Sequence, residues 1–129
     1  MEIFKIITLA LSGSLLLFVG MMRLSNPIKT YLKNSGIKLE KDASLLNEMR
    51  GVSGVMLLGG IIILLGIIVS KLTFTSFVVA ILIFLGFGIG RMLSISLDGK
   101  PNKLITQGLA SELVLATLNI ICLVSLVTI

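Results

Sequence analysis

Mostly apolar residues fill four long stretches of the chain, and each stretch can cross a membrane as a helix. A hydrocarbon core about 30 Å thick needs about 20 apolar residues at about 1.5 Å per residue. The predicted spans cover residues 3–22, 51–70, 72–90 and 106–129. The pattern predicts an all-α integral membrane bundle of four transmembrane helices, antiparallel and up-down. Because the spans take up most of the chain, we expect a single domain over residues 1–129.

The first stretch also has the layout of a secretory signal peptide, with Lys5 placed before an apolar segment over residues 6–19. A pattern of small residues should then mark a cleavage site. The residues that follow are Gly20-Met21-Met22-Arg23, which do not fit such a site. We therefore expect the first helix to be retained.

The basic residues gather in two of the three segments between the spans. Nine of the eleven Lys and Arg residues lie there: Arg23, Lys29, Lys33, Lys38, Lys41, Arg50, Arg91, Lys100 and Lys103. Short cytoplasmic loops are enriched in Lys and Arg. We therefore expect an inner-membrane protein with these loops in the cytoplasm and both termini outside it. The net charge of +5 then reflects the orientation of the helices in the membrane. The expected partners are membrane lipids and a protein partner or second copy of the chain, not nucleic acid.

A short amphipathic pattern lies in the first basic segment. Asn26-Pro27 is typical of a helix start, and Asn34-Ser35-Gly36 of a helix end. Between them, Ile28, Tyr31 and Leu32 would share one helical face. Two interpretations stay open: a short helix lying in the headgroup region, and an irregular polar loop.

Composition leaves few side chains for chemistry. Of the 129 residues, 56% are hydrophobic and 13% charged, whereas soluble domains carry about 25% charged residues. An ordinary soluble enzyme is therefore excluded. The chain has no histidine, and Cys122 is its single cysteine. Zinc sites built on His or several Cys, and histidine-based triads, are thus excluded, and no metal or cofactor is expected.

Glycines are the main candidates for helix packing. Helices in lipid associate through close contacts at small residues and through polar contacts. The chain has thirteen glycines, most of them in or beside the spans, and Gly86 and Gly90 stand in a GxxxG relation. We expect these glycines to form tight helix crossings rather than to line a ligand groove.

The candidate site consists of polar residues at the predicted cytoplasmic ends of the spans, where Arg23 also ends the first span. Its members are Glu48, Arg50, Arg91, Asp98, Glu112 and Asn119. Asn119 shares a helical face with Glu112, about 10 Å further into the membrane. Two interpretations remain: structural ion pairs at the membrane edge, and a site for a ligand or substrate.

Two functions follow from these interpretations. The first is a helical bundle that acts as a partner subunit or binds a lipid or small amphiphile. The second is a membrane enzyme with Glu48 or Glu112 as the acid or base, and Arg50 or Arg91 holding negative charge on a lipid-like substrate. Transport is least favoured, because Asn119 and scattered hydroxyls are the only polar groups near the midplane.

Several of these residues belong to a recognisable pattern. The chain carries Asn47-Glu48-Met49-Arg50-Gly51, then Gly90-Arg91, then Asp98-Gly99-Lys100-Pro101, and finally Glu112. Nearly the whole chain resembles the domain of unknown function 4345 family, which consists of small bacterial four-helix membrane proteins. Ser53 differs from the family, in which an aromatic residue is common at this position. The resemblance implies no activity, but it implies that the charged residues of the candidate site matter as a group.

Overall fold

The computed structural model describes residues 1–128, and all its regular elements are helices. They are α1 Glu2–Ser25, α2 Pro27–Ser35, α3 Ala43–Ile68, α4 Thr73–Asp98 and α5 Lys103–Val127, with a 3₁₀ turn, η1 Ser70–Leu72, before α4. No strand occurs among the described residues. Four of the helices are long and apolar enough to cross a membrane. The predictions of an all-helical fold and of four long apolar helices are confirmed. Residue 129, the last of the fourth predicted span, lies outside the described residues.

The helices extend beyond the predicted spans at the basic end of the molecule. α3 begins at Ala43, well before Gly51, because the Asp42 carboxylate accepts a hydrogen bond from Leu45 N at 3.2 Å and caps the helix. α4 continues to Asp98 and ends at Gly99, which has a φ of 104°. At the other end, α3 stops at Ile68, two residues earlier than predicted. Hydropathy locates the apolar part of a helix, whereas caps and glycines decide where the helix ends.

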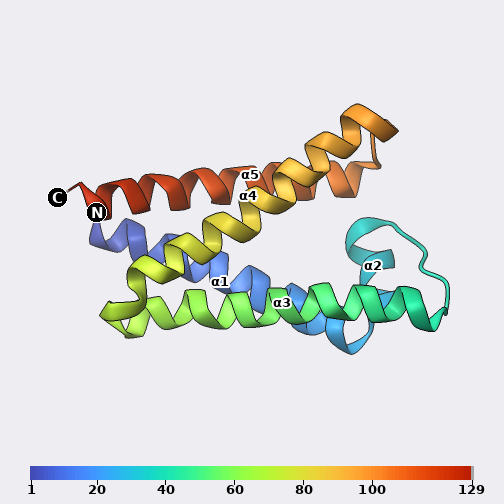
Figure 1. The fold of residues 1–129 in the computed structure, drawn as a ribbon, viewed down its shortest axis with the longest axis horizontal. Helices are drawn as coiled ribbons and strands as arrows, with labels where there is room; N and C mark the ends of the chain where they lie inside the picture. Colours follow the sequence, from blue (N-terminus) through green and yellow to red (C-terminus); the bar gives the residue numbers. More distant parts are fainter. Residues whose placement is uncertain (129) are drawn as a thin grey trace.

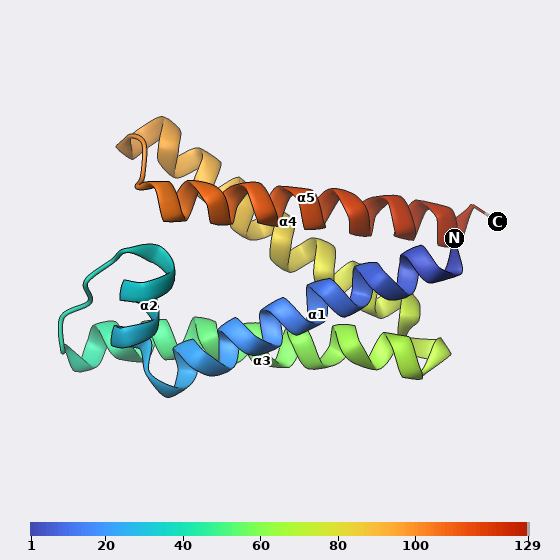
Figure 2. The ribbon, with the colours of Figure 1, turned by 180° about the vertical axis from the view of Figure 1, so that it is seen from behind.

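The long helices form two pairs. Figure 1 shows α1 against α3, while α4 runs obliquely from the end of α3 and crosses α5. Both chain termini and η1 lie at one end, and α2 lies at the other. Figure 2, seen from behind, shows the pairs diverging towards the end with α2, which folds back between them. This divergence positions the site described below.

Residues 27–35 form a helix rather than an irregular loop. Asn26 Oδ1 accepts from Lys29 N at 3.3 Å, and Pro27 occupies the first turn. The buried face consists of Pro27, Thr30, Tyr31 and Ser35. Of the predicted face of Ile28, Tyr31 and Leu32, Tyr31 is buried against the protein, whereas Leu32 is 54% exposed.

Glycines let the backbones of α1 and α3 touch. A Cβ atom added at Gly60 would lie 2.7 Å from Leu17 N and 2.9 Å from Gly13 O. A Cβ atom added at Gly20 would lie 2.7 Å from Leu57 N. Because these neighbours are backbone atoms, they cannot move aside without separating the helices. The predicted use of glycine for tight crossings therefore applies to this pair.

The Gly86–Gly90 motif does not pack within the chain, contrary to expectation. A Cβ atom at either position would meet nothing within 4 Å. Gly88 packs instead, since its added Cβ would lie 2.8 Å from Leu113 Cδ2 on α5. The rotation of α4 that buries Phe84 and Gly88 turns Gly86 and Gly90 outwards.

A buried polar contact joins α5 to α1 in the core. Asn119 is fully buried, and its Nδ2 donates to Ser12 Oγ at 2.9 Å and to Leu115 O at 2.7 Å. Within residues 1–128, Asn119 Oδ1 has no hydrogen-bond partner. The predicted site residue Asn119 thus lies in the core, where interhelical hydrogen bonds hold membrane helices together.

We expect Gly60→Ala to destabilise the protein by about 1–3 kcal/mol, the usual cost of overpacking a tight contact. Gly86→Ala is the matched control, because its Cβ enters open space. The measurement is unfolding by sodium dodecyl sulfate in mixed micelles, followed by circular dichroism. Equal stability of the two variants would contradict the close approach of α1 and α3.

A double-mutant cycle between Asn119→Ala and Ser12→Ala should give a coupling free energy of about 0.5–1.5 kcal/mol, the range for hydrogen bonds between membrane helices. Thr117→Ala replaces Ser12→Ala in the control cycle, because the exposed Thr117 donates to Leu113 O of its own helix. The same unfolding assay measures both cycles. Additive effects of Asn119→Ala and Ser12→Ala would show that this hydrogen bond does not stabilise the fold.

Candidate functional site

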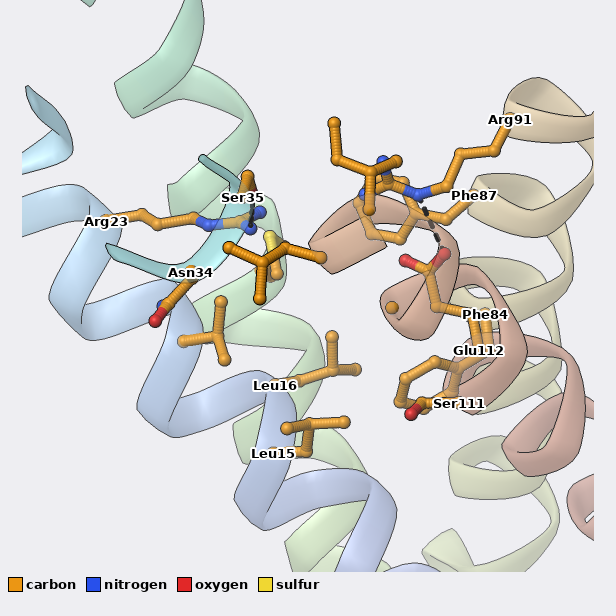
Figure 3. Close-up of a pocket in the computed structure, with 15 residues that line it drawn as sticks. Leu15, Leu16, Arg23, Asn34, Ser35, Phe84, Phe87, Arg91, Ser111 and Glu112 are labelled. Carbon is orange, nitrogen blue, oxygen red and sulfur yellow. Dashed lines mark hydrogen bonds and ion pairs between the residues drawn. The ribbon is translucent and has the colours of Figure 1, made fainter. Parts of the chain in front are cut away.

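A cavity of about 180 Å³ lies where the two helix pairs diverge (Figure 3). All five α-helices contribute to its wall. Its apolar lining is Leu15, Leu16, Val19, Met56, Phe84, Phe87, Leu104 and Ile105, and its polar side chains are Arg23, Asn34, Ser35, Arg91, Ser111 and Glu112. Mostly apolar walls with a few polar groups are typical of small-molecule sites.

Arg91 and Glu112 form an ion pair on one side of the cavity. Arg91 Nε lies 2.8 Å from Glu112 Oε1, and the two side chains are 31% and 14% exposed. The Arg91 guanidinium carbon also lies 6.0 Å from the centroid of the Phe87 ring, one turn earlier on α4. The pair joins α4 to α5 and orients the Arg91 side chain along the cavity wall.

Arg23 reaches into the cavity from the opposite side, from the last turn of α1 (Figure 3). Its guanidinium lies 4.3 Å from the centroid of the Tyr31 ring, and Nη2 donates to Ser35 Oγ at 3.2 Å. Among the described residues, its buried Nε has no hydrogen-bond partner, and no carboxylate forms an ion pair with it. Arg23 therefore places in the cavity a guanidinium group that is fixed in position by Tyr31 and Ser35 and still has a donor without an acceptor.

α2 holds Arg23 in this position because α2 is itself fixed at both ends. Thr30 Oγ1 donates to Met22 O at 3.0 Å, which ties α2 to the end of α1. Asn102 Nδ2 donates to Ser35 O at 2.8 Å, which ties the other end to the start of α5. Gly36, with a φ of 65°, turns the chain away after α2. The side chains of Tyr31 and Ser35 are thereby kept against Arg23.

Two predicted site residues lie on α3, outside the cavity. Arg50 donates through Nη1 to Leu24 O and, at 3.4 Å, to Ser25 O, and so ties α3 to the end of α1. Glu48 is exposed and lies beside Ala43, Ser44 and Asn47 in a shallow depression of its own. Glu48 and Glu112 do not line a common cavity, so of the two candidate acid–base residues only Glu112 lies beside Arg91.

Asp98 also lies outside the cavity, at the exposed end of α4. Its carboxylate accepts from Ser94 Oγ at 2.9 Å, and within residues 1–128 it forms no ion pair with Arg91, although the two share a predicted helical face. Of the six predicted site residues, the structure brings together only Arg91 and Glu112 in the cavity. It adds Arg23, which the sequence placed at the same membrane boundary but did not single out.

The cavity is suited to an anion. Arg23 and Arg91 supply two positive charges, and Glu112 supplies the single negative charge among the lining residues described. Guanidinium groups offer fixed donors that match carboxylate and phosphate oxygens. No cluster of three His, Cys, Asp or Glu side chains that could hold a metal ion occurs in residues 1–128.

Comparison with known proteins places the chain in a family. A family model described as a domain of unknown function (DUF4345) matches residues 3–123. Comparisons with curated proteins and with solved structures give no match. The family match includes nearly all of the four long apolar helices and every predicted site residue. The resemblance inferred from the sequence motifs is confirmed, and the chain belongs to the domain of unknown function 4345 family.

Proposed function

We propose that this membrane-embedded protein binds a lipid or small amphiphile through an anionic headgroup in the cavity between Arg23 and Arg91. The observation that carries the proposal is the imbalance of charge in that cavity. Two guanidinium groups face it from opposite sides, and the one carboxylate, Glu112, is already paired with Arg91. An anionic headgroup oxygen would supply the negative charge that Arg23 lacks.

The state of Arg23 supports an anion rather than a neutral ligand. A buried donor without an acceptor costs about 1–3 kcal/mol, and more when it belongs to a charged group. Arg23 Nε is such a donor within the described chain. An anion that accepts from Nε would remove this penalty and balance the second positive charge. The hydroxyl of Ser35 lies next to the same guanidinium and provides a further polar contact.

The apolar wall supports an amphiphile rather than a free inorganic ion. Leu15, Leu16, Phe84 and Phe87 line the cavity beside the charged groups. A hydrated phosphate would leave this surface in contact with water, whereas a hydrocarbon chain would cover it at a gain of about 25 cal/mol per Å². The proposed partner is therefore a membrane lipid or a related amphiphile.

We further propose that the cavity opens at the cytoplasmic side of the inner membrane. Both termini and η1 lie at one end of the molecule, and α2 lies at the other with most of the basic residues (Figure 1). The positive-inside rule then favours four antiparallel spans with both termini outside the cytoplasm. In this orientation, α2 would lie at the cytoplasmic interface, with the exposed Leu32 towards the lipid.

Binding of dodecyl phosphate to the protein in a neutral detergent should weaken about tenfold or more in Arg23→Gln, which corresponds to the loss of one charged hydrogen bond. Isothermal titration calorimetry measures the affinity, and circular dichroism checks the fold. Lys33→Gln removes an exposed charge from α2, outside the cavity, and should leave the affinity unchanged. Equal weakening in both variants would reduce the interaction to general surface attraction and contradict the proposal.

Single cysteines in a Cys122→Ser background test the proposed orientation. Lys71→Cys, in η1, should react with a membrane-impermeant maleimide on intact cells. Lys38→Cys, after α2, should react only after the membrane is permeabilised. Both native lysines are exposed, so burial does not protect either position. The reverse labelling pattern would place the cavity on the outer side.

A further inference from the structure

The charged cavity continues into an apolar groove between α1 and α5. The groove is lined by Leu11, Leu15, Ala110, Ser111, Val114 and Leu115. Leu15 and Ser111 line both the cavity and the groove. Figure 3 shows these two residues at the end of the cavity away from the guanidinium groups of Arg23 and Arg91. Headgroup site and groove therefore form one continuous surface with a polar end and an apolar end.

The groove is open to the outside of the bundle. Leu11 is 55% exposed and Val114 57% exposed, and both would face hydrocarbon in a membrane. The Ser111 hydroxyl donates to Gln107 O at 3.2 Å on its own helix, so it brings no unpaired donor to the groove. A molecule in the bilayer could enter the groove from the side without passing through water.

The length of the groove fits one lipid leaflet. Along α1, Arg23 and Leu11 are twelve residues apart, which corresponds to about 18 Å of helix. Half of a hydrocarbon core is about 15 Å thick. The groove thus extends from the charged boundary to about the middle of the membrane, as the chain of a lipid does.

The groove has one wall on each of the two helices. Its wall on α1 is the single row Leu11 and Leu15, and its wall on α5 comes from two successive turns, Ala110–Ser111 and Val114–Leu115. The cavity at its head is only slightly larger than an engineered cavity of about 150 Å³ that holds benzene. The groove itself has a volume of about 440 Å³.

We infer that the ligand is a single-chain anionic amphiphile taken from the bilayer, with its headgroup at Arg23 and Arg91 and its chain in the groove between α1 and α5. This inference rests on the proposed function and adds the ligand class, the place of its chain and its lateral route of entry. The charges of Arg23 and Arg91 determine where the headgroup binds, and the continuity of the cavity with the groove determines where the chain lies.

The test compares butyl phosphate with dodecyl phosphate on the wild-type protein and on two variants in the same neutral detergent. Val114→Phe fills the groove, whereas Val124→Phe makes the same change on the same helix outside it, at a position 52% exposed. We expect the wild type and Val124→Phe to bind dodecyl phosphate at least about tenfold more tightly than butyl phosphate, because the longer chain buries more methylenes. Val114→Phe should bind both ligands with the affinity of butyl phosphate.

The results distinguish a failure of the inference alone from a failure of the proposed function. If Val114→Phe keeps the preference for the longer chain while Arg23→Gln weakens binding, the headgroup site stands and the chain lies elsewhere, which overturns the inference. If neither alkyl phosphate binds the wild type, or if Arg23→Gln leaves binding unchanged, the proposed function fails together with the inference.

A second measurement locates the chain directly. The protein has no tryptophan, so Val114→Trp and Val124→Trp each carry a single indole fluorophore. Dodecyl phosphate brominated near the middle of its chain should quench the Val114→Trp variant strongly at low ligand-to-detergent ratios and the Val124→Trp variant weakly. The difference should disappear when Arg23→Gln is added. Equal quenching of the two variants would mean that the chain does not occupy the groove.

Discussion

The arrangement of the bundle depends on the backbone contact between α1 and α3. Gly20 and Gly60 allow this approach, since a Cβ at either position would collide with backbone atoms of the partner helix. α1 contacts α5 less extensively than it contacts α3, through the Asn119–Ser12 hydrogen bond and the nearby contact of Cys122 Sγ with Thr8 Oγ1. Towards the basic end of the molecule, the cavity and the groove both have walls on α1 and α5.

Electrostatics then distinguishes the two sides of the cavity. On one side, the Arg91–Glu112 pair is largely neutral and ties α4 to α5. On the other side, Arg23 rests on Tyr31 and Ser35 and lacks a carboxylate among the described residues. Ion pairing at a membrane edge and ligand binding were alternatives at the level of sequence. In the structure, an ion pair and an unpaired arginine share one cavity, so the first interpretation does not exclude the second.

The candidate site was predictable only in part. Glu112 stood out as an acidic residue inside an apolar helix, and Arg91 as the basic end of the preceding span, but which arginine pairs with Glu112 became known only from the structure. The role of Arg23 depends on α2, which turns back onto the end of α1. Two hydrogen bonds hold α2 there, one from Thr30 to α1 and one from Asn102, at the start of α5, to the end of α2. Glu48 and Arg50 are two residues apart on α3, yet neither lines the cavity, since the rotation of α3 is set by its glycine face against α1.

The sequence by itself determined the four apolar stretches, the all-helical class, the basic end of the molecule and the family. These properties follow from residues close together in the chain and from the thickness of a bilayer, so the local sequence suffices. The tertiary structure alone decided which glycines pack, as Gly60 and Gly88 do and Gly86 and Gly90 do not. It also decided which charges share a cavity. Both outcomes depend on how each helix is rotated about its axis, and that rotation is set by contacts between residues distant in sequence.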